Sequence, residues 1–262
     1  MQYLITFLVI VVVFYFCRRF VLPFWYQYSA LSLLRSGSPE KAVVQLTKLL
    51  SISPRYPIAW YYRGLLMCEF GRLPDALHDL DQAIRLAPRR LEPLFDRAKI
   101  YMELEKYDQA LEDLNRIASL HPFPIQALLT RSAVYIHLGN YQKAEEDCQW
   151  ILKRDPEQIG AIINRGIARK KQGNYDAAIA DFTFVLLLVP DSVLALNQYA
   201  ACRIEKEEYE QAVHICDHII KLDPWSAPAY YYRSLGKEKL NLPEEAKKDF
   251  DKAVELHYEK YI

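Results

Sequence analysis

Two histidines and a cysteine stand close together in the stretch HICDH, at His214, Cys216 and His218. His214 and His218 are one helical turn apart, so both could bind a metal ion from one face of a helix. A four-coordinate site needs further ligands, and the sequence shows no second pair with suitable spacing. We therefore interpret these residues as surface or packing residues and expect no metal and no cofactor.

Acidic side chains cluster in two short segments, Glu145-Glu146-Asp147 and Glu205, Glu207 and Glu208. Neighbouring carboxylates can act as general acid and base, but both segments fall on helix faces that we expect to be solvated. The sequence contains no Walker A loop, no G-x-S-x-G, no H-E-x-x-H and no G-x-G-x-x-G. We expect a protein that is not an enzyme and has no small-molecule substrate.

Arginine and aspartate recur together at a spacing of 16 residues. The pairs are Arg63 and Asp79, Arg97 and Asp113, Arg131 and Asp147, Arg165 and Asp181, and Arg233 and Asp249. At the equivalent place between the fourth and fifth of these pairs, both residues are replaced together, by Tyr199 and Ile215. Because joint replacement is expected of residues that touch, the pattern predicts five ion pairs between helices. Exposed to solvent, each would contribute at most about 1 kcal/mol.

These pairs belong to a repeat of 34 residues whose units span 23–56, 57–90, 91–124, 125–158, 159–192, 193–226 and 227–260. Position 20 of every unit is alanine: Ala42, Ala76, Ala110, Ala144, Ala178, Ala212 and Ala246. Position 8 is small in every unit, and position 32 is proline in all but the last. The recurrence of three positions through the chain predicts one structural unit repeated seven times.

Each unit has the pattern of two amphipathic helices, as residues 159–192 illustrate. The first helix is followed by a turn at Gly173-Asn174-Tyr175, and Pro190 ends the second. Small residues at positions 8 and 20 let the two helices approach closely, because side chains at the contact set the distance between helix axes. The sequence therefore predicts an all-α chain of helical hairpins.

This 34-residue pattern resembles the tetratricopeptide repeat family. The resemblance covers residues 23–260, about nine tenths of the chain. It implies a right-handed superhelical solenoid of about seven helix-turn-helix repeats, which we expect to be continuous because such stacks grow one repeat at a time.

The resemblance also implies a concave groove, lined by positions 2, 5, 9 and 12 of the first helices, that binds a protein partner. The expected groove residues are Tyr61, Leu65, Phe95, Lys99, Leu129, Ala133, Ile136, Ile163, Ile167, Asn197 and Tyr231. We expect most of them to be exposed. Some family members bind acidic chaperone termini through lysine at position 5 and asparagine at position 9, and neither occurs here.

The charge balance argues against a nucleic-acid partner. Lys plus Arg and Asp plus Glu both number 33, whereas nucleic-acid binders present a basic surface. The five cysteines include no C-x-x-C, which is typical of thiols in a reducing compartment.

The N-terminal segment is apolar enough to contact a membrane. Residues 3–17 are uncharged, and residues 20–22 extend the apolar run past Arg18 and Arg19. We expect residues 1–22 to form an uncleaved transmembrane anchor, with 3–22 in the bilayer; a cleaved signal peptide and a buried core helix are the alternatives. Because Arg35 and Lys41 also follow the span, the positive-inside rule predicts a single-pass protein whose repeats face the cytoplasm.

Together these features favour a membrane-anchored scaffold or assembly factor that holds a membrane-associated protein partner. The layout resembles anchored tetratricopeptide assembly factors, including those of photosystem biogenesis. A targeting or import receptor is one alternative, and a regulatory subunit of a membrane enzyme complex is another.

Overall fold

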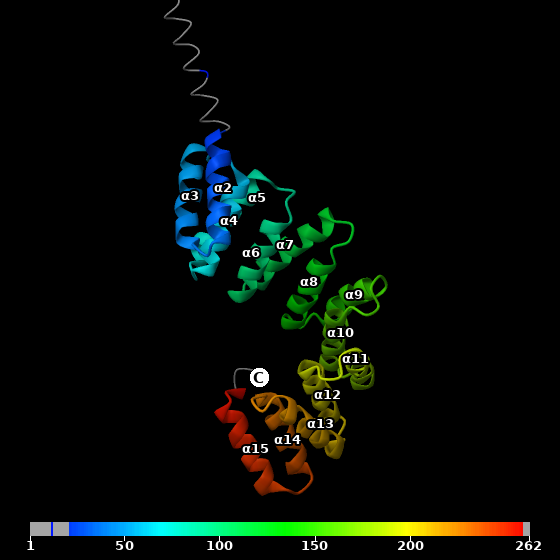
Figure 1. Ribbon diagram of the computed structural model, residues 1–262. Coiled ribbons are helices and arrows are strands. Elements are labelled where there is room, and N and C mark those ends of the chain that lie inside the picture. Colours follow the sequence, from blue (N-terminus) through cyan, green and yellow to red (C-terminus); the bar gives the residue numbers. More distant parts are fainter. Residues whose placement is uncertain (1–11, 13–20, 259–262) are drawn as a thin grey trace, which may run out of the picture. The chain divides into compact units, whose positions relative to one another are not determined.

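The computed structural model describes residue 12 and residues 21–258, and the helices α2–α15 in this part of the chain form seven hairpins (Figure 1). The first helices are α2 (Leu22–Arg35), α4 (Pro57–Glu69), α6 (Glu92–Glu103), α8 (Ile125–His137), α10 (Ile159–Lys171), α12 (Val193–Glu205) and α14 (Ala227–Lys239). The second helices are α3 (Pro39–Ile52), α5 (Leu73–Leu86), α7 (Tyr107–Leu120), α9 (Tyr141–Leu152), α11 (Tyr175–Leu188), α13 (Tyr209–Leu222) and α15 (Pro243–Glu255).

The expected membrane anchor, residues 1–22, lies almost entirely outside the described residues. Among the residues that are described, no helix combines the length and the apolar character that a bilayer crossing requires.

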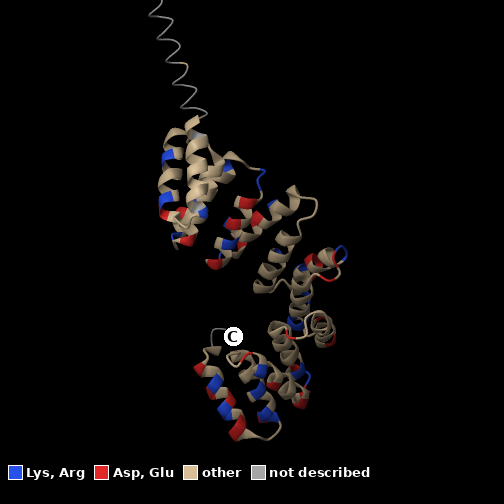
Figure 2. Cartoon of the chain, in the orientation of Figure 1, with Lys and Arg blue, Asp and Glu red and all other residues tan. Residues whose placement is uncertain are grey.

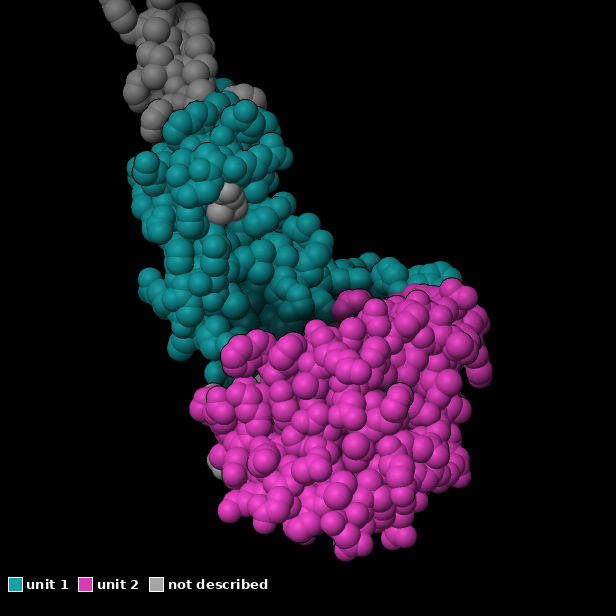
Figure 3. Space-filling view, turned by 60° about the horizontal axis from the view of Figure 1, so that its bottom comes forward, with its two compact units in different colours: residues 1–123 teal, residues 124–262 magenta. Residues whose placement is uncertain are grey.

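The chain divides into two compact units, residues 1–123 and 124–262 (Figure 3). From the regular repeat we expected one unbroken solenoid. The division falls in the connection between α7 and α8, where Pro122 and Pro124 flank Phe123. Proline lacks a backbone N–H and restricts the residue before it, so this connection is extended rather than helical. The first unit contains three hairpins, α2–α7, and the second contains four, α8–α15.

Within each hairpin the two helices pack through the small positions that the repeat predicted. Ala144 and Ala178 are completely buried, and so is Phe182, at position 24 of the fifth repeat. A Cβ atom on Gly166 would lie only 2.7 Å from Cε1 of Phe182. Position 8 is therefore glycine in this hairpin, because a Cβ atom there would overlap the facing aromatic ring in a close-packed interior.

Each turn between paired helices uses one residue with a left-handed backbone. Gly37, Gly71, Gly139 and Gly173 have φ of 71°, 70°, 73° and 80°. At the same place in the other three hairpins, Glu105, Glu207 and Asn241 have φ of 56°, 61° and 60°. Glycine adopts this conformation without steric cost, whereas glutamate does not. The turn geometry is thus set by the hairpin and not by the residue type.

Within each unit, successive hairpins stack mainly through the second helix of one and the first helix of the next. In the second unit α10 packs on α8, α12 on α10 and α14 on α12, while each of α9, α11 and α13 contacts the first helix that follows it. In the first unit α3 packs on α4 and α5 on α6. We call the surface formed by positions 5, 9 and 12 of the first helices in each unit the first-helix face.

Charged residues are spread over both units, but α2 has only Arg35 while α15 has many of both signs (Figure 2). Three aromatic side chains of α2 are strongly exposed: Phe24 at 72%, Trp25 at 54% and Tyr28 at 66%. Aromatic side chains of this size are usually at least partly buried. Exposed on α2, they form an apolar surface, whereas most of the chain's helices present polar side chains to solvent.

Candidate functional site

The five predicted ion pairs all form. The shortest N–O distances are 2.7 Å for Arg63–Asp79, 2.6 Å for Arg97–Asp113, Arg131–Asp147 and Arg165–Asp181, and 2.5 Å for Arg233–Asp249. In each pair Nε and Nη2 of the arginine donate to the two carboxylate oxygens. The aspartate side chains are at most 9% exposed. The limit for exposed pairs does not apply to them, because removing one partner strands a buried charge.

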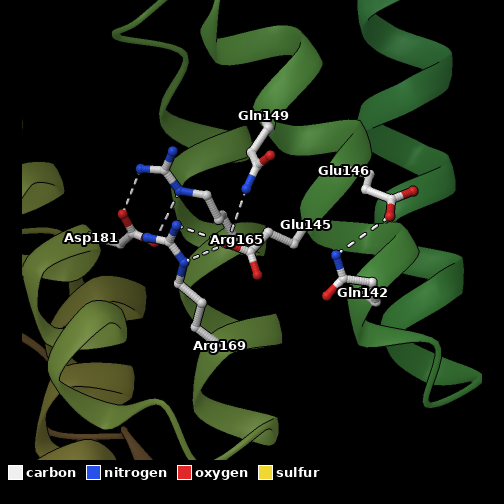
Figure 4. Close-up of polar contacts among 7 residues, drawn as sticks. All are labelled: Gln142, Glu145, Glu146, Gln149, Arg165, Arg169 and Asp181. Atoms are coloured by element: carbon white, nitrogen blue, oxygen red, sulfur yellow. Dashed lines mark hydrogen bonds and ion pairs between the residues drawn. The ribbon is translucent and has the colours of Figure 1, made fainter.

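In the fifth hairpin the pair is part of a larger network (Figure 4). Asp181 accepts from Arg165 and also from Nη1 of Arg169, at 3.0 Å. Arg169 in turn donates through Nε to Glu145 on α9, at 2.8 Å. Asp147 is buried and paired with Arg131. The solvated setting that we expected for Glu145 and Asp147 is therefore wrong, because arginines of the first helices reach both carboxylates.

The sixth hairpin replaces the ion pair with different contacts. Nη2 of Arg203 donates to the Tyr199 hydroxyl at 2.7 Å, and the guanidinium carbon lies 4.9 Å from the centre of that ring. Arg203 also forms an ion pair with Glu208 at the start of α13. Ile215 packs against the apolar cluster of Leu196, Ile219 and Ala229. The arginine thus comes from position 11 of the first helix instead of position 7.

In the first unit, the expected groove residues form a connected cluster on α4 and α6. The Tyr61 hydroxyl donates to Oδ2 of Asp96 at 2.9 Å, and Nζ of Lys99 donates to Oδ1 of the same carboxylate at 3.0 Å. Nζ of Lys99 also lies 4.5 Å from the centre of the Phe95 ring. Burial and the Asp96 hydrogen bond raise the pKa of Tyr61 above its usual value, so the phenol remains a donor. We call this group the Tyr61–Lys99 cluster.

Asp96 had not been expected at this site. It lies at position 6, next to the positions from which the groove was predicted. Its role follows from its neighbours, because an acidic residue there can reach both a tyrosine on the first helix of the preceding hairpin and a lysine one turn away on its own helix. Nearby, Leu65 is half-buried.

In the second unit, the expected groove residues are less accessible than predicted. Ile163 is 7% exposed and belongs to the core formed with Ile162, Val185 and Ala195. The remaining apolar members are half-buried: Leu129, Ala133, Ile136 and Ile167. Of all eleven expected residues, only Lys99 is exposed. The expectation that most would be exposed is wrong, because adjacent first helices pack against each other on this side.

A polar group lies between α10, α12 and α14. Asn197 is 8% exposed and donates through Nδ2 to the Ser226 hydroxyl at 3.2 Å, while its buried Oδ1 finds no hydrogen-bond partner among the described residues. Nζ of Lys170 donates to Oε1 of Gln198 at 2.6 Å. Burial lowers the pKa of Lys170. Lys170 occupies position 12, one of the positions from which the groove was predicted.

Tyr231, the last expected groove residue, is covered by a residue from the end of the described chain. Its ring stacks on Tyr258, with centroids 4.1 Å apart and an angle of 18° between the planes. Tyr258 is 7% exposed and also packs on Ala227 and Ala253. The final hairpin therefore closes its own end of the first-helix face with an aromatic pair.

Within the described residues, no three histidine, cysteine, aspartate or glutamate side chains are placed to hold a metal ion. Cys216 is completely buried, and burial raises its pKa to about 12, while His214 is exposed. A cleft of about 240 Å³ between α3, α4 and α5 contains the Arg63–Asp79 pair and Met67. Its Arg63–Asp79 and Arg72–Asp75 pairs are already formed, and no residue of the Tyr61–Lys99 cluster lines it.

Comparison with known proteins agrees with this architecture. Residues 29–90 and 95–159 match one model of the tetratricopeptide repeat, and residues 170–232 match a second. No curated protein gives a match in sequence.

Solved structures share the fold at low sequence identity. A tetratricopeptide repeat protein from Parabacteroides merdae is 24% identical, with a TM-score of 0.76 over 90% of this chain and 93% of its own. PilW, a type IV pilus biogenesis factor, is 15% identical, with a TM-score of 0.67 over 79% and 96%.

YrrB, described as having an unusual peptide-binding site, is 19% identical, with a TM-score of 0.58 over 70% of this chain and 95% of its own. The two family models together cover most of the chain, and the hairpin geometry repeats through both units. This protein therefore belongs to the tetratricopeptide repeat family.

Proposed function

We propose that this protein is a membrane-anchored scaffold or assembly factor that binds a segment of a protein partner on its first-helix face. Repeats of this family are protein-interaction modules, and the relatives include one protein with a peptide-binding site and one biogenesis factor. Membrane anchoring and the assembly role extend this general function to the particular layout of this chain.

The observation that carries the proposal is the Tyr61–Lys99 cluster. Lys99 is 57% exposed at its side chain, and its ammonium group sits above the half-buried Phe95 ring. A partner segment can bury an apolar side chain beside that ring while an acidic neighbour approaches the ammonium group. The Tyr61–Asp96 hydrogen bond holds α4 and α6 in register and so fixes the site before a partner arrives.

The test places a photo-crosslinking amino acid at position 99 and, as a matched control, at Lys106, which is exposed at the start of α7. In membranes, we expect position 99 to crosslink a partner that position 106 does not. Phe95→Ala should reduce that product at least about tenfold, as expected for an aromatic anchor. Equal products at both positions, or no loss with Phe95→Ala, would contradict the proposed surface.

The identity of the crosslinked proteins separates the alternatives. Several unassembled subunits would support an assembly factor, many unrelated precursors a targeting or import receptor, and a single enzyme a regulatory subunit. The cluster itself fits any protein segment that is apolar with an acidic flank.

The anchoring proposal rests on residues 3–22 and on the apolar surface that follows them. Phe24, Trp25 and Tyr28 are exposed on α2 within about 9 Å of helix rise after Leu22. Aromatic side chains concentrate where a helix passes through the interface between lipid and water. These exposed rings support a position of α2 at the membrane surface.

The side of the membrane that the repeats face can be tested with an impermeant thiol reagent. A cysteine at Gln142, which is exposed in the first turn of α9, should remain unlabelled in intact cells and become labelled after lysis. The background lacks Cys17 and Cys68; the remaining cysteines are buried. Labelling in intact cells would contradict the cytoplasmic orientation.

A further inference from the structure

The outer side of α11 differs from that of every other second helix. Its residues at positions 19, 22, 26 and 29 are Ala177, Ala180, Phe184 and Leu187. The other six second helices each carry at least one charged residue at these four positions. In the next hairpin, for example, the four are Gln211, His214, His218 and Lys221. Only α11 is apolar at all four, and we call these residues the α11 seam.

The α11 seam is accessible in the second unit. Leu187 is 73% exposed and Phe184 is 40% exposed, and Ala180, near the middle of α11, is exposed as well. Leu188, Val189 and Leu194, at the end of α11 and the start of α12, are also exposed, at 37%, 39% and 53%. A helix that is apolar all round is normally covered on every side. Here α10 and α12 cover one side only.

The spacing of the seam indicates what covers it. Residues 177, 180, 184 and 187 follow intervals of three, four and three, which is the a and d pattern of one helix packing along another. The sole charged residue along this stretch of α11, Asp181, points inward to Arg165 and Arg169. The occupant is therefore an α-helix that presents apolar residues with the same intervals.

The order of small and large residues identifies that helix. In an antiparallel pair of two α11 helices, Ala177 lies opposite Leu187 of the other copy, and Ala180 lies opposite Phe184. Both layers then match a small side chain with a large one, about a single two-fold axis. A parallel pair would set alanine on alanine and leave a void, at a cost that close packing makes large. We propose that α11 binds a second copy of this chain through an antiparallel two-fold contact.

The size of the surface sets the expected strength. An exposed apolar strip of this kind measures on the order of a few hundred Å², below the ~800 Å² per partner of a standard stable interface. The dimer is thus weak, with a dissociation constant expected in the micromolar range. It uses the second helix of the fifth hairpin and leaves the first-helix face free, so it is independent of the proposed partner-binding function.

The decisive variant combines Phe184→Gln with Leu187→Lys. The chain already has Gln82 at the first of these positions and Lys221 at the second, in other hairpins, so both residues suit the fold. Sedimentation velocity of the full chain in detergent should show self-association that rises with concentration. The double variant should weaken it at least about tenfold, because it places a lysine in the contact. Ser119→Lys, a matched control at the position of Leu187 in the third hairpin, should change nothing.

Cysteine pairing tests the direction of the contact. A chain with Ala180→Cys is mixed with a differently tagged chain with Phe184→Cys, both lacking Cys17 and Cys68. The antiparallel pair predicts a disulfide between the two chains, whereas a parallel pair predicts Ala180→Cys chains joined to each other. The latter result would overturn the proposed geometry. A wild type that stays monomeric at about 100 μM, or a double variant that associates equally well, would overturn the dimer and leave the α11 seam to a different protein.

Discussion

The fifth and sixth hairpins have the same helix lengths and turn geometry but hold their two helices together differently. The fifth uses the bidentate pair of Arg165 and Asp181. The sixth has Tyr199 and Ile215 at those positions, and its arginine, Arg203, turns to Tyr199 and Glu208. The hairpin therefore does not require the ion pair. A buried charge between the two helices does, however, need a partner of opposite charge.

The two hairpins also divide the space between their helices in different ways. Gly166 faces the Phe182 ring in the fifth, whereas the sixth has Ala200 and Cys216 at the same positions. A larger residue on one helix is thus matched by a smaller one on the other. Total volume is kept while the individual residues change, as close-packed interiors demand.

The largest effect is expected from Asp181→Ala. It leaves both Arg165 and Arg169 without their buried carboxylate, and should cost about 3–5 kcal/mol. Urea unfolding followed by circular dichroism measures the change. Asp75→Ala is the matched control, because its partner Arg72 and Asp75 itself are both more than half exposed; it should cost at most about 1 kcal/mol. Similar losses for both would show that burial does not strengthen the pair.

Gly166→Ala should come next, at about 1–3 kcal/mol, because the new methyl group meets Phe182 at 2.7 Å. Adding Phe182→Cys creates the combination that the sixth hairpin already uses, and should recover part of the loss. Thermal unfolding of the two single variants and the double variant gives the coupling. Simple additivity of the two changes would mean that they do not share one packing space.

The ion pair can also be transferred into the sixth hairpin. Ile215→Asp alone puts a carboxylate beside an apolar cluster and should destabilise by about 1–2 kcal/mol. Tyr199→Arg together with Ile215→Asp restores the arrangement of the fifth hairpin, in which Arg169 occupies the position of Arg203. We expect a favourable coupling of about 1 kcal/mol in a double-mutant cycle. A coupling of zero would show that backbone differences, and not side chains, decide which hairpins have the pair.

The smallest effect concerns Lys170, whose counterpart in the sixth hairpin is Ile204. Burial lowers the pKa of Lys170 in the folded chain, so between that pKa and the ordinary lysine value the unfolded chain binds more protons. Folding stability should therefore gain from this group as the pH rises toward about 10.4. Lys170→Ile should remove that gain, so the unfolding free energy of the variant should rise less between pH 8 and pH 10 than that of the wild type. A slope unchanged from wild type would assign the pH dependence to other groups.

Much of the architecture could be predicted because it depends on spacing. The period of 34 residues predicted the helical hairpins and their residue ranges. The joint loss of arginine and aspartate at Tyr199 and Ile215 predicted the ion pairs between helices. Exposure could not be predicted in the same way. Ile163 and Asn197 occupy groove positions in the pattern, yet both are buried, because the neighbouring first helices approach closely enough to cover them. The distance between neighbouring first helices depends on packing between repeats, and the position of a residue within one repeat carries no information about it.

The network in Figure 4 has a consequence for how the repeats unfold. Arg169 on α10 holds Glu145 of the preceding hairpin and Asp181 of its own at the same time. In a linear array, stability is a sum of the terms for single repeats and for the interfaces between neighbours. A side chain that contributes to both kinds of term makes one hairpin less able to open alone. The fourth and fifth hairpins should therefore open as a single cooperative unit, with the slowest amide exchange along α10, where the two are joined.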